Sequence, residues 1–267
     1  MQFANPPVTL DLKTSASWSG TGSLQATIFD FGALSMAYRW PLPCNSGLPL
    51  DQLASLGADL YRQNMEALAR RESVSLLDRI TLAIQRPKIS DLTEDYYLYI
   101  LEDIEPSLTA AMVLMKFRRE LAQALTFETS RLSDWQIEET SSKCLSYLEN
   151  DLTVVDWNAA VIYDRDHEDT VRVLELLNVE LLEARYIDET LDHNVKVYAN
   201  LVYKPATWPI PLRTPYRRVL RELTEWRIES TLLSERVTNA LKLIGDLYLS
   251  GFTRRQLQKC NCRNGKR

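Results

Sequence analysis

The sequence predicts an α+β protein in which a mixed α/β head precedes two long antiparallel helices. Strand-like and helix-like segments alternate before residue 165, whereas the later sequence carries only helical patterns. Glycine is also scarce, with eight residues among 267, which disfavours a loop-dominated all-β fold. We therefore divide the chain into a head at 1–165, a helical hairpin at 166–250 and a basic tail at 251–267 that we expect to be disordered.

The first part of the head is expected to contain two extended pieces followed by a helix. Residues 1–23 mix proline, serine and glycine and predict an irregular or edge segment. The extended pieces are Gln25–Phe29 and Ala33–Trp40, and Gly32 between them accommodates a positive φ at little cost. Apolar residues on one side of Leu50–Arg71 predict the helix.

The rest of the head is expected to alternate strands with helices. The predicted strands are Val74–Ile84, Tyr96–Leu101 and Leu152–Tyr163, and the predicted helices are Ser107–Thr126 and Leu132–Leu148. Ser133, followed three residues later by Gln136, is the expected N-cap of the second helix.

Two heptad patterns follow the head and predict long helices at 166–202 and 213–249. The apolar stripe of each helix is expected to face a partner, and Leu181 and Leu233 are expected to be buried. A segment with four prolines, Lys204–Pro215, separates the two helices. The interface residues predicted from the stripes are Leu174, Leu177, Leu181, Asp188, Leu191, Leu223, Trp226, Leu233 and Val237.

Asp188 interrupts the first stripe at a position where an apolar side chain is expected. A buried carboxylate must be paired, so Asp188 either sets the register of the helices or binds an ion. The alternative, which we prefer, is that local packing leaves it half exposed.

No catalytic, cofactor-binding or metal-binding residue is predicted. Phosphate-binding glycine loops are absent, and the two histidines, His167 and His193, lie too far apart on one straight helix to share a site. The acidic run Asp164–Asp169 around His167 is read as a helix N-terminus in preference to a metal site. The tryptophans Trp135, Trp157, Trp208 and Trp226 are interpreted as core residues in preference to a ligand box or a base-stacking platform.

Charge is unevenly distributed along the chain. The last seventeen residues contain six basic and no acidic side chains, which leaves 25 basic and 36 acidic residues, a net charge of −11, in the rest. An acidic body disfavours nonspecific binding to nucleic acid, so no specific nucleic-acid partner is predicted. The four cysteines form no disulfide framework, and the uncharged run Ser107–Met115 is far shorter than the ~20 residues that span a bilayer. The chain as given is therefore expected to be soluble and cytoplasmic.

Three stretches, Ile28–Ser35, Asp151–Asp164 and Arg236–Leu249, together resemble bacterial relatives of the "required for meiotic nuclear division" proteins, a family of unknown function with mitochondrial members in eukaryotes. The resemblance implies no catalytic activity. It does imply membrane association of the full-length family form, whose members typically continue into membrane-spanning segments. The general plan is also similar to that of CorA-type magnesium transporters, although their Gly-Met-Asn pore signature is absent here. From Gly251 onward the sequence departs from the family pattern, because it becomes basic and carries no apolar anchor.

These observations favour a non-enzymatic interaction or scaffold protein that self-associates through its heptad helices as a homo-oligomer, with other protein partners possible. The alternative is a regulatory or transport-associated domain whose acidic helix faces sense a divalent cation. An enzyme of unknown chemistry is the least favoured of the three.

Overall fold

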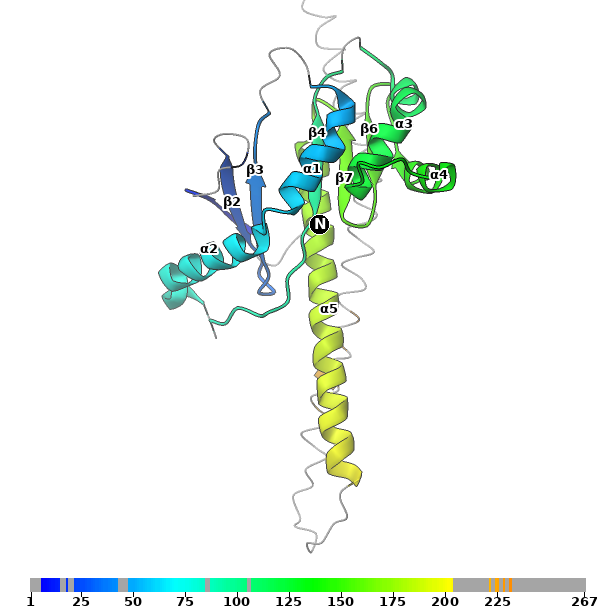
Figure 1. Cartoon of the computed structure of the whole chain (residues 1–267). Helices are drawn as coiled ribbons and strands as arrows, with labels where there is room; N and C mark the ends of the chain where they lie inside the picture. Colours follow the sequence, from blue (N-terminus) through cyan, green and yellow to red (C-terminus); the bar gives the residue numbers. More distant parts are fainter. Residues whose placement is uncertain are drawn as a thin grey trace, which may run out of the picture. The chain divides into compact units, whose positions relative to one another are not determined.

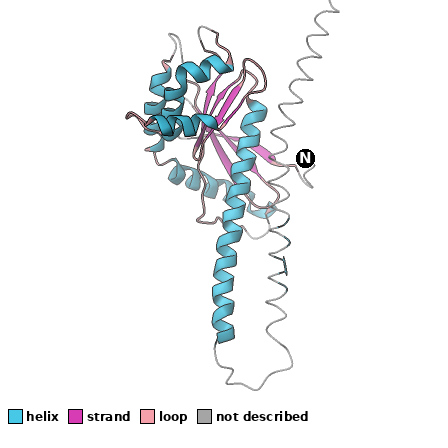
Figure 2. Ribbon diagram, turned by 90° about the vertical axis from the view of Figure 1, so that its right-hand side faces the viewer, coloured by secondary structure: helices cyan, strands magenta, loops and turns pink. Residues whose placement is uncertain are grey.

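The structure of the chain is a computed structural model. It describes residues 6–14, 18, 22–42, 48–84, 87–104 and 107–203, with only the backbone from 193 to 203, together with residues 221, 224, 225, 228 and 231. The described residues form two β-sheets and five α-helices, which confirms the predicted α+β class (Figures 1 and 2). The chain divides into two compact units, one of residues 2–172 and one that begins at Val173.

The first sheet is an antiparallel meander of β1 (Val8–Leu12), β2 (Ser23–Ile28) and β3 (Leu34–Arg39), in that order. The two predicted extended pieces are thus confirmed, and the N-terminal segment contributes an edge strand. Gly32 lies in the β2–β3 turn with φ +98°, a conformation that glycine adopts readily and L-residues rarely do.

The helix predicted at 50–71 is broken, and the strand predicted at 74–84 is wrong. A 3₁₀ turn (Leu50–Gln52) leads into α1 (Leu53–Tyr61), and α2 (Met65–Ile80) follows after a short break and ends in a second 3₁₀ turn (Thr81–Ala83). Asn64 starts α2 from the left-handed region, with φ 50°, and its side chain accepts a hydrogen bond from the Ala67 N–H. The short apolar run is one side of an amphipathic helix, because Ser73 and Leu76 are buried whereas Val74 is exposed.

The second sheet has the order β4-β7-β6-β5, in which β4 runs parallel to β7 and the other pairs are antiparallel. Its strands are β4 (Tyr97–Leu101), β5 (Cys144–Leu145), β6 (Leu152–Val155) and β7 (Ala159–Tyr163). The strand predicted at Tyr96–Leu101 is confirmed. The strand predicted at Leu152–Tyr163 is a hairpin, because Asp156, Trp157 and Asn158 form a turn that the Asp156 N–H closes on the Ala159 carbonyl at 2.8 Å.

Helices α3 (Ala110–Thr126) and α4 (Asp134–Ser142) connect β4 to β5. The predicted N-cap of α4 is confirmed, because the Ser133 hydroxyl accepts a hydrogen bond from the Gln136 N–H at 3.2 Å. The helix predicted to continue to Leu148 ends six residues earlier, where the chain enters the edge strand β5.

The main core lies between one face of the second sheet and helix α3. Val113, Leu121 and Leu125 of α3 are buried in one cluster with Val154 of β6 and Val161 of β7. Helix α1 packs on α3 (Figure 1). The Tyr99 hydroxyl donates a hydrogen bond to the Ala124 carbonyl at 3.1 Å, which ties β4 to the end of α3.

Helix α5 (Glu168–Tyr203) is 36 residues long, about 54 Å at the usual rise of 1.5 Å per residue, and its extent is visible in Figure 2. It confirms the helix predicted at 166–202. Glu168 and Asp169 occupy its first turn, where they complement the helix dipole, as predicted. The pairing with a second helix at 213–249, the proline segment and the basic tail fall outside the described residues.

Candidate functional site

The candidate site is the predicted interface stripe on α5, and several buried side chains of this helix follow a neighbouring stripe. Four buried residues recur at steps of three, four and seven, each one position before a member of the predicted stripe. These four are Val173, Leu176, Glu180 and Ile187, and Val171, Leu174 and Val179 of the same helix are buried as well. One position along an α-helix corresponds to a rotation of about 100°, so the stripe of these four residues is turned by that angle from the predicted one.

The physical reason for this rotation lies in two apolar pairs at the start of the helix. Val173 is followed by Leu174, and Leu176 by Leu177, so heptad spacing is satisfied equally well by either member of each pair. Leu174 is itself buried, and Leu177 is half-buried. Further along, Glu180 and Ile187 of the neighbouring stripe are buried, whereas Leu181 and Asp188 of the predicted stripe are exposed.

Leu181 is therefore not buried, contrary to the prediction. Its side chain is 39% exposed, next to fully buried Glu180. Asp188 is exposed as well, in line with our preferred interpretation of this residue, and Leu191 is half-buried. The predicted interface residues of α5 thus form a stripe that runs from a buried start at Leu174 to an exposed middle.

The other predicted interface residues, Leu223, Trp226, Leu233 and Val237, lie outside the described residues.

A polar contact fixes the beginning of α5 within the first unit. The Arg39 guanidinium at the end of β3 donates to both carboxylate oxygens of Glu168, at 2.8 and 3.4 Å. Hydrogen bonding and the charge of Arg39 hold the pKa of Glu168 below its usual value. The His167 side chain, which is largely buried, lies beside the same carboxylate, with Nε2 3.7 Å from Oε1. In the part of the chain that the structure describes, no three His, Cys, Asp or Glu side chains converge to hold a metal ion.

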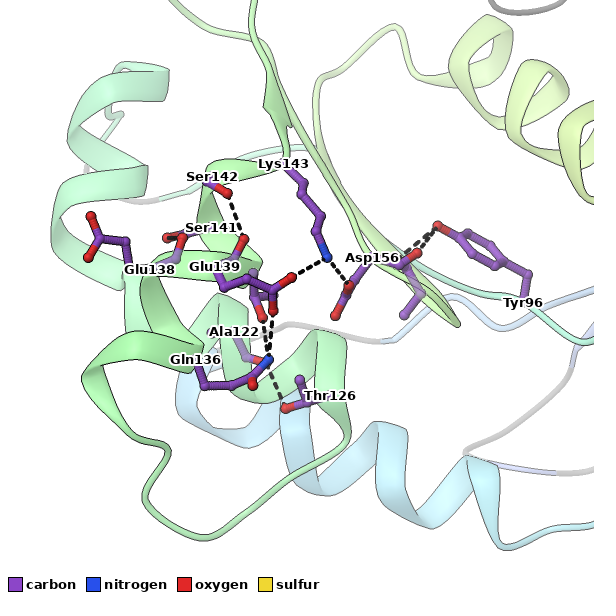
Figure 3. Close-up of polar contacts among 12 residues, drawn as sticks. Tyr96, Ala122, Thr126, Gln136, Glu138, Glu139, Ser141, Ser142, Lys143 and Asp156 are labelled. Atoms are coloured by element: carbon purple, nitrogen blue, oxygen red, sulfur yellow. Dashed lines mark hydrogen bonds and ion pairs between the residues drawn. The ribbon is translucent and has the colours of Figure 1, made fainter.

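A second polar cluster, which the sequence did not indicate, joins the end of α4 to the β6–β7 turn (Figure 3). The Lys143 ammonium lies 2.9 Å from Glu139 Oε1 and 3.1 Å from Asp156 Oδ1. Hydrogen bonds to these two carboxylates raise the pKa of Lys143. The Tyr96 hydroxyl bonds the Asp156 and Ala159 carbonyls at 3.0 and 2.9 Å, so the cluster fixes the turn.

Two tryptophans that were predicted to be core residues are exposed instead. Trp157 at the tip of this turn is 75% exposed, and Trp135 in the first turn of α4 is 72% exposed. Both lie at the end of an element, one in the turn between β6 and β7 and the other in the first turn of α4. Helices α3 and α4 also line a shallow groove of about 510 Å³. Met115 and Arg119 lie on its α3 side, and Ile137 and Glu138 lie on its α4 side.

The fold and this site define a class: an α+β head followed by a long helix whose heptad stripe is buried at Leu174 and exposed at Leu181. Residues 1–170 match the family described as "Uncharacterized protein MJ0711, N-terminal domain", and the chain belongs to this family. The matched region contains both sheets and ends within the first turn of α5, so the candidate stripe lies beyond it. No curated protein and no solved structure matches the chain. Along the described residues, no helix has an apolar stretch that would cross a bilayer.

Proposed function

We propose that the protein is a non-enzymatic interaction protein that self-associates through the exposed stripe of α5. The observation that supports this proposal is the position of Leu181, which keeps 39% of its side chain exposed within a stripe of heptad spacing. A neighbouring stripe of the same helix is already covered, so the exposed one is available to a further helix. Leu181 continues, at heptad spacing, a row of apolar residues that begins with Leu174 and Leu177, and such a row is typical of a helix-pairing surface.

The dimensions of α5 suit such an interface. A specific protein–protein contact buries roughly 1,200–2,000 Å² in total, and a helix of about 54 Å is long enough to contribute one side of it. Asp188 then lies within the stripe as an exposed carboxylate. A polar residue at such a seam position favours one register of the paired helices, because other registers place the carboxylate against apolar side chains.

Further elements of this proposal follow from the sequence. The protein acts as a homo-oligomeric scaffold in the cytoplasm, binds other proteins and has no catalytic residues of its own. The resemblance to "required for meiotic nuclear division" proteins supports membrane association of the full-length family form.

The proposal is tested by placing a charge on the exposed stripe and measuring association by sedimentation velocity. Leu181→Glu introduces a carboxylate that must be desolvated in the interface, so we expect a dissociation constant at least tenfold higher than for the unmodified chain. Tyr186→Glu is the matched control, because Tyr186 is also exposed but lies about 140° away around the helix. Equal effects of the two variants would contradict an interface centred on Leu181.

A further inference from the structure

The outer edge of β4 offers backbone groups that point away from the sheet. In the described part of the chain, β4 is an edge strand whose one neighbour is β7. The Tyr97 N–H donates to the Asn158 carbonyl at 2.9 Å, and in a parallel ladder the backbone groups of alternate residues point to the same side. The backbone N–H and C=O groups of Tyr97, Tyr99 and Leu101 therefore point to β7. Those of Leu98 and Ile100 point outward, away from the sheet.

This edge lacks the features that protect the other sheet edges in the described residues. Strand β5 has two residues, β1 carries Asp11, and α2 packs against β3, where the Tyr38 hydroxyl bonds Glu72. Strand β4 has five consecutive apolar or aromatic residues, and each is partly exposed. A strand of this kind pairs readily with another extended chain.

The charges around β4 determine which chain it accepts. Carboxylates stand at both ends of the strand: Asp95 precedes it, and Glu102 and Asp103 follow it, all three with exposed side chains. Arg165 pairs with Asp103, which leaves an acidic excess at the edge. If two β4 strands paired antiparallel about Tyr99, Asp95 would lie opposite the partner's Asp103, and like charges opposite each other are destabilising. The ends of the strand thus disfavour a second copy and favour basic residues.

We propose that the outer edge of β4 binds an extended peptide segment of a partner protein, with a short uncharged centre and basic residues at both ends. The segment adds as a strand: its backbone pairs with the four outward groups of Leu98 and Ile100, and its basic residues meet Asp95 and Glu102. This site lies in the head and uses none of the α5 stripe, so it stands independently of self-association.

Amide hydrogen exchange followed by NMR on the full chain tests this site. The probes are two synthetic peptides, Lys-Lys-Val-Thr-Val-Thr-Val-Lys-Lys and the same sequence with every lysine replaced by glutamate. In the free protein the Leu98 and Ile100 amides exchange quickly, and the Tyr99 amide exchanges slowly. The basic peptide slows exchange at Leu98 and Ile100 at least tenfold, and the acidic peptide leaves it unchanged.

Charge reversal at the edge provides the second arm of the test. Glu102→Lys weakens binding of the basic peptide about three- to tenfold, because it replaces a favourable surface charge pair by a repulsive one. Glu138→Lys on α4 is the control, since it makes the same change of net charge at an exposed position away from β4. Slow exchange at Leu98 and Ile100 in the free protein, equal protection by both peptides, protection that grows with protein concentration alone, or equal effects of the two variants would each overturn the proposal.

Discussion

The head and α5 obtain their burial in different ways. In the head, β7 is buried along all five residues; its neighbour β4 and the covering helix α3 come from separate parts of the sequence, and β6 joins it through a hairpin. Helix α5 forms from one continuous stretch, and buried and exposed residues alternate along it. The core of the head is thus built from segments that lie far apart in the sequence, whereas α5 is a local element with exposed residues such as Leu181 and Asp188.

The largest expected effect is a difference in unfolding free energy when the same substitution, leucine to alanine, is made in the head and in α5. Leu121→Ala in the head removes a side chain that is 1% exposed and should cost about 2–5 kcal/mol of unfolding free energy, because a cavity remains in a packed core. Leu181→Ala in α5 removes a partly exposed side chain and should cost about 1 kcal/mol or less. Urea unfolding at a protein concentration that keeps the chain dissociated measures both. Similar losses would show that α5 is packed as tightly as the head.

Gly57→Ala tests the close approach of α1 to β4. A Cβ atom at residue 57 would overlap the Tyr99 hydroxyl and lie 2.9 Å from Phe127 Cδ1, so we expect a loss of about 1–3 kcal/mol from overpacking. Gly57→Ala should be partly rescued by Tyr99→Phe, which removes the overlapping oxygen. A stabilised single variant, as expected for an alanine in an open helix, would contradict this packing.

Ser133→Ala probes a local feature of the head. Loss of the hydroxyl that accepts the Gln136 N–H should cost about 1 kcal/mol, and Ser133→Asp, which keeps an acceptor, should restore most of it. Thermal unfolding followed by circular dichroism is sufficient. If Ser133→Ala left the stability unchanged, water would satisfy the N-terminal backbone groups of α4 as well as the Ser133 hydroxyl does.

The smallest effect concerns the ion pair at the start of α5. Because Arg39 lowers the folded-state pKa of Glu168, the pair stabilises the protein above the unfolded pKa of about 4.3, and this contribution is lost as the pH falls through the lower folded value. Both side chains are well exposed, so Arg39→Met should cost only about 0.2–1 kcal/mol at pH 7. The difference between the variant and the unmodified chain should shrink as the pH falls from about 4.3 through the lower folded-state pKa of Glu168. A constant difference across this range would contradict an electrostatic origin.

Several features of this fold were predictable because their signals are local. The Gly32 turn, the N-cap at Ser133 and the acidic start of α5 each depend on residues a few positions apart. The strand predicted at 74–84 failed because a short apolar run suits a buried strand and one side of a helix equally well.

The buried face of α5 and the exposure of Trp135 and Trp157 could not be predicted from the sequence, for a different reason. Adjacent apolar residues such as Val173 and Leu174 satisfy the same spacing and are both buried, and the two stripes differ in burial only further along, at Glu180 and Leu181. The exposure of Trp157 depends on a turn that long-range contacts with Lys143 and Tyr96 hold in place. The β4 edge likewise depends on the order of strands in the sheet, which no single segment specifies.

The central claim, self-association through α5, is tested most directly by the mass of the unmodified chain as a function of concentration. Sedimentation equilibrium should show a monomer of 30.7 kDa at the lowest concentrations and a dimer or larger assembly in the micromolar range. The transition should move to higher concentration in Leu181→Glu and stay in place in Tyr186→Glu. A monomer mass that does not change with concentration would contradict the account.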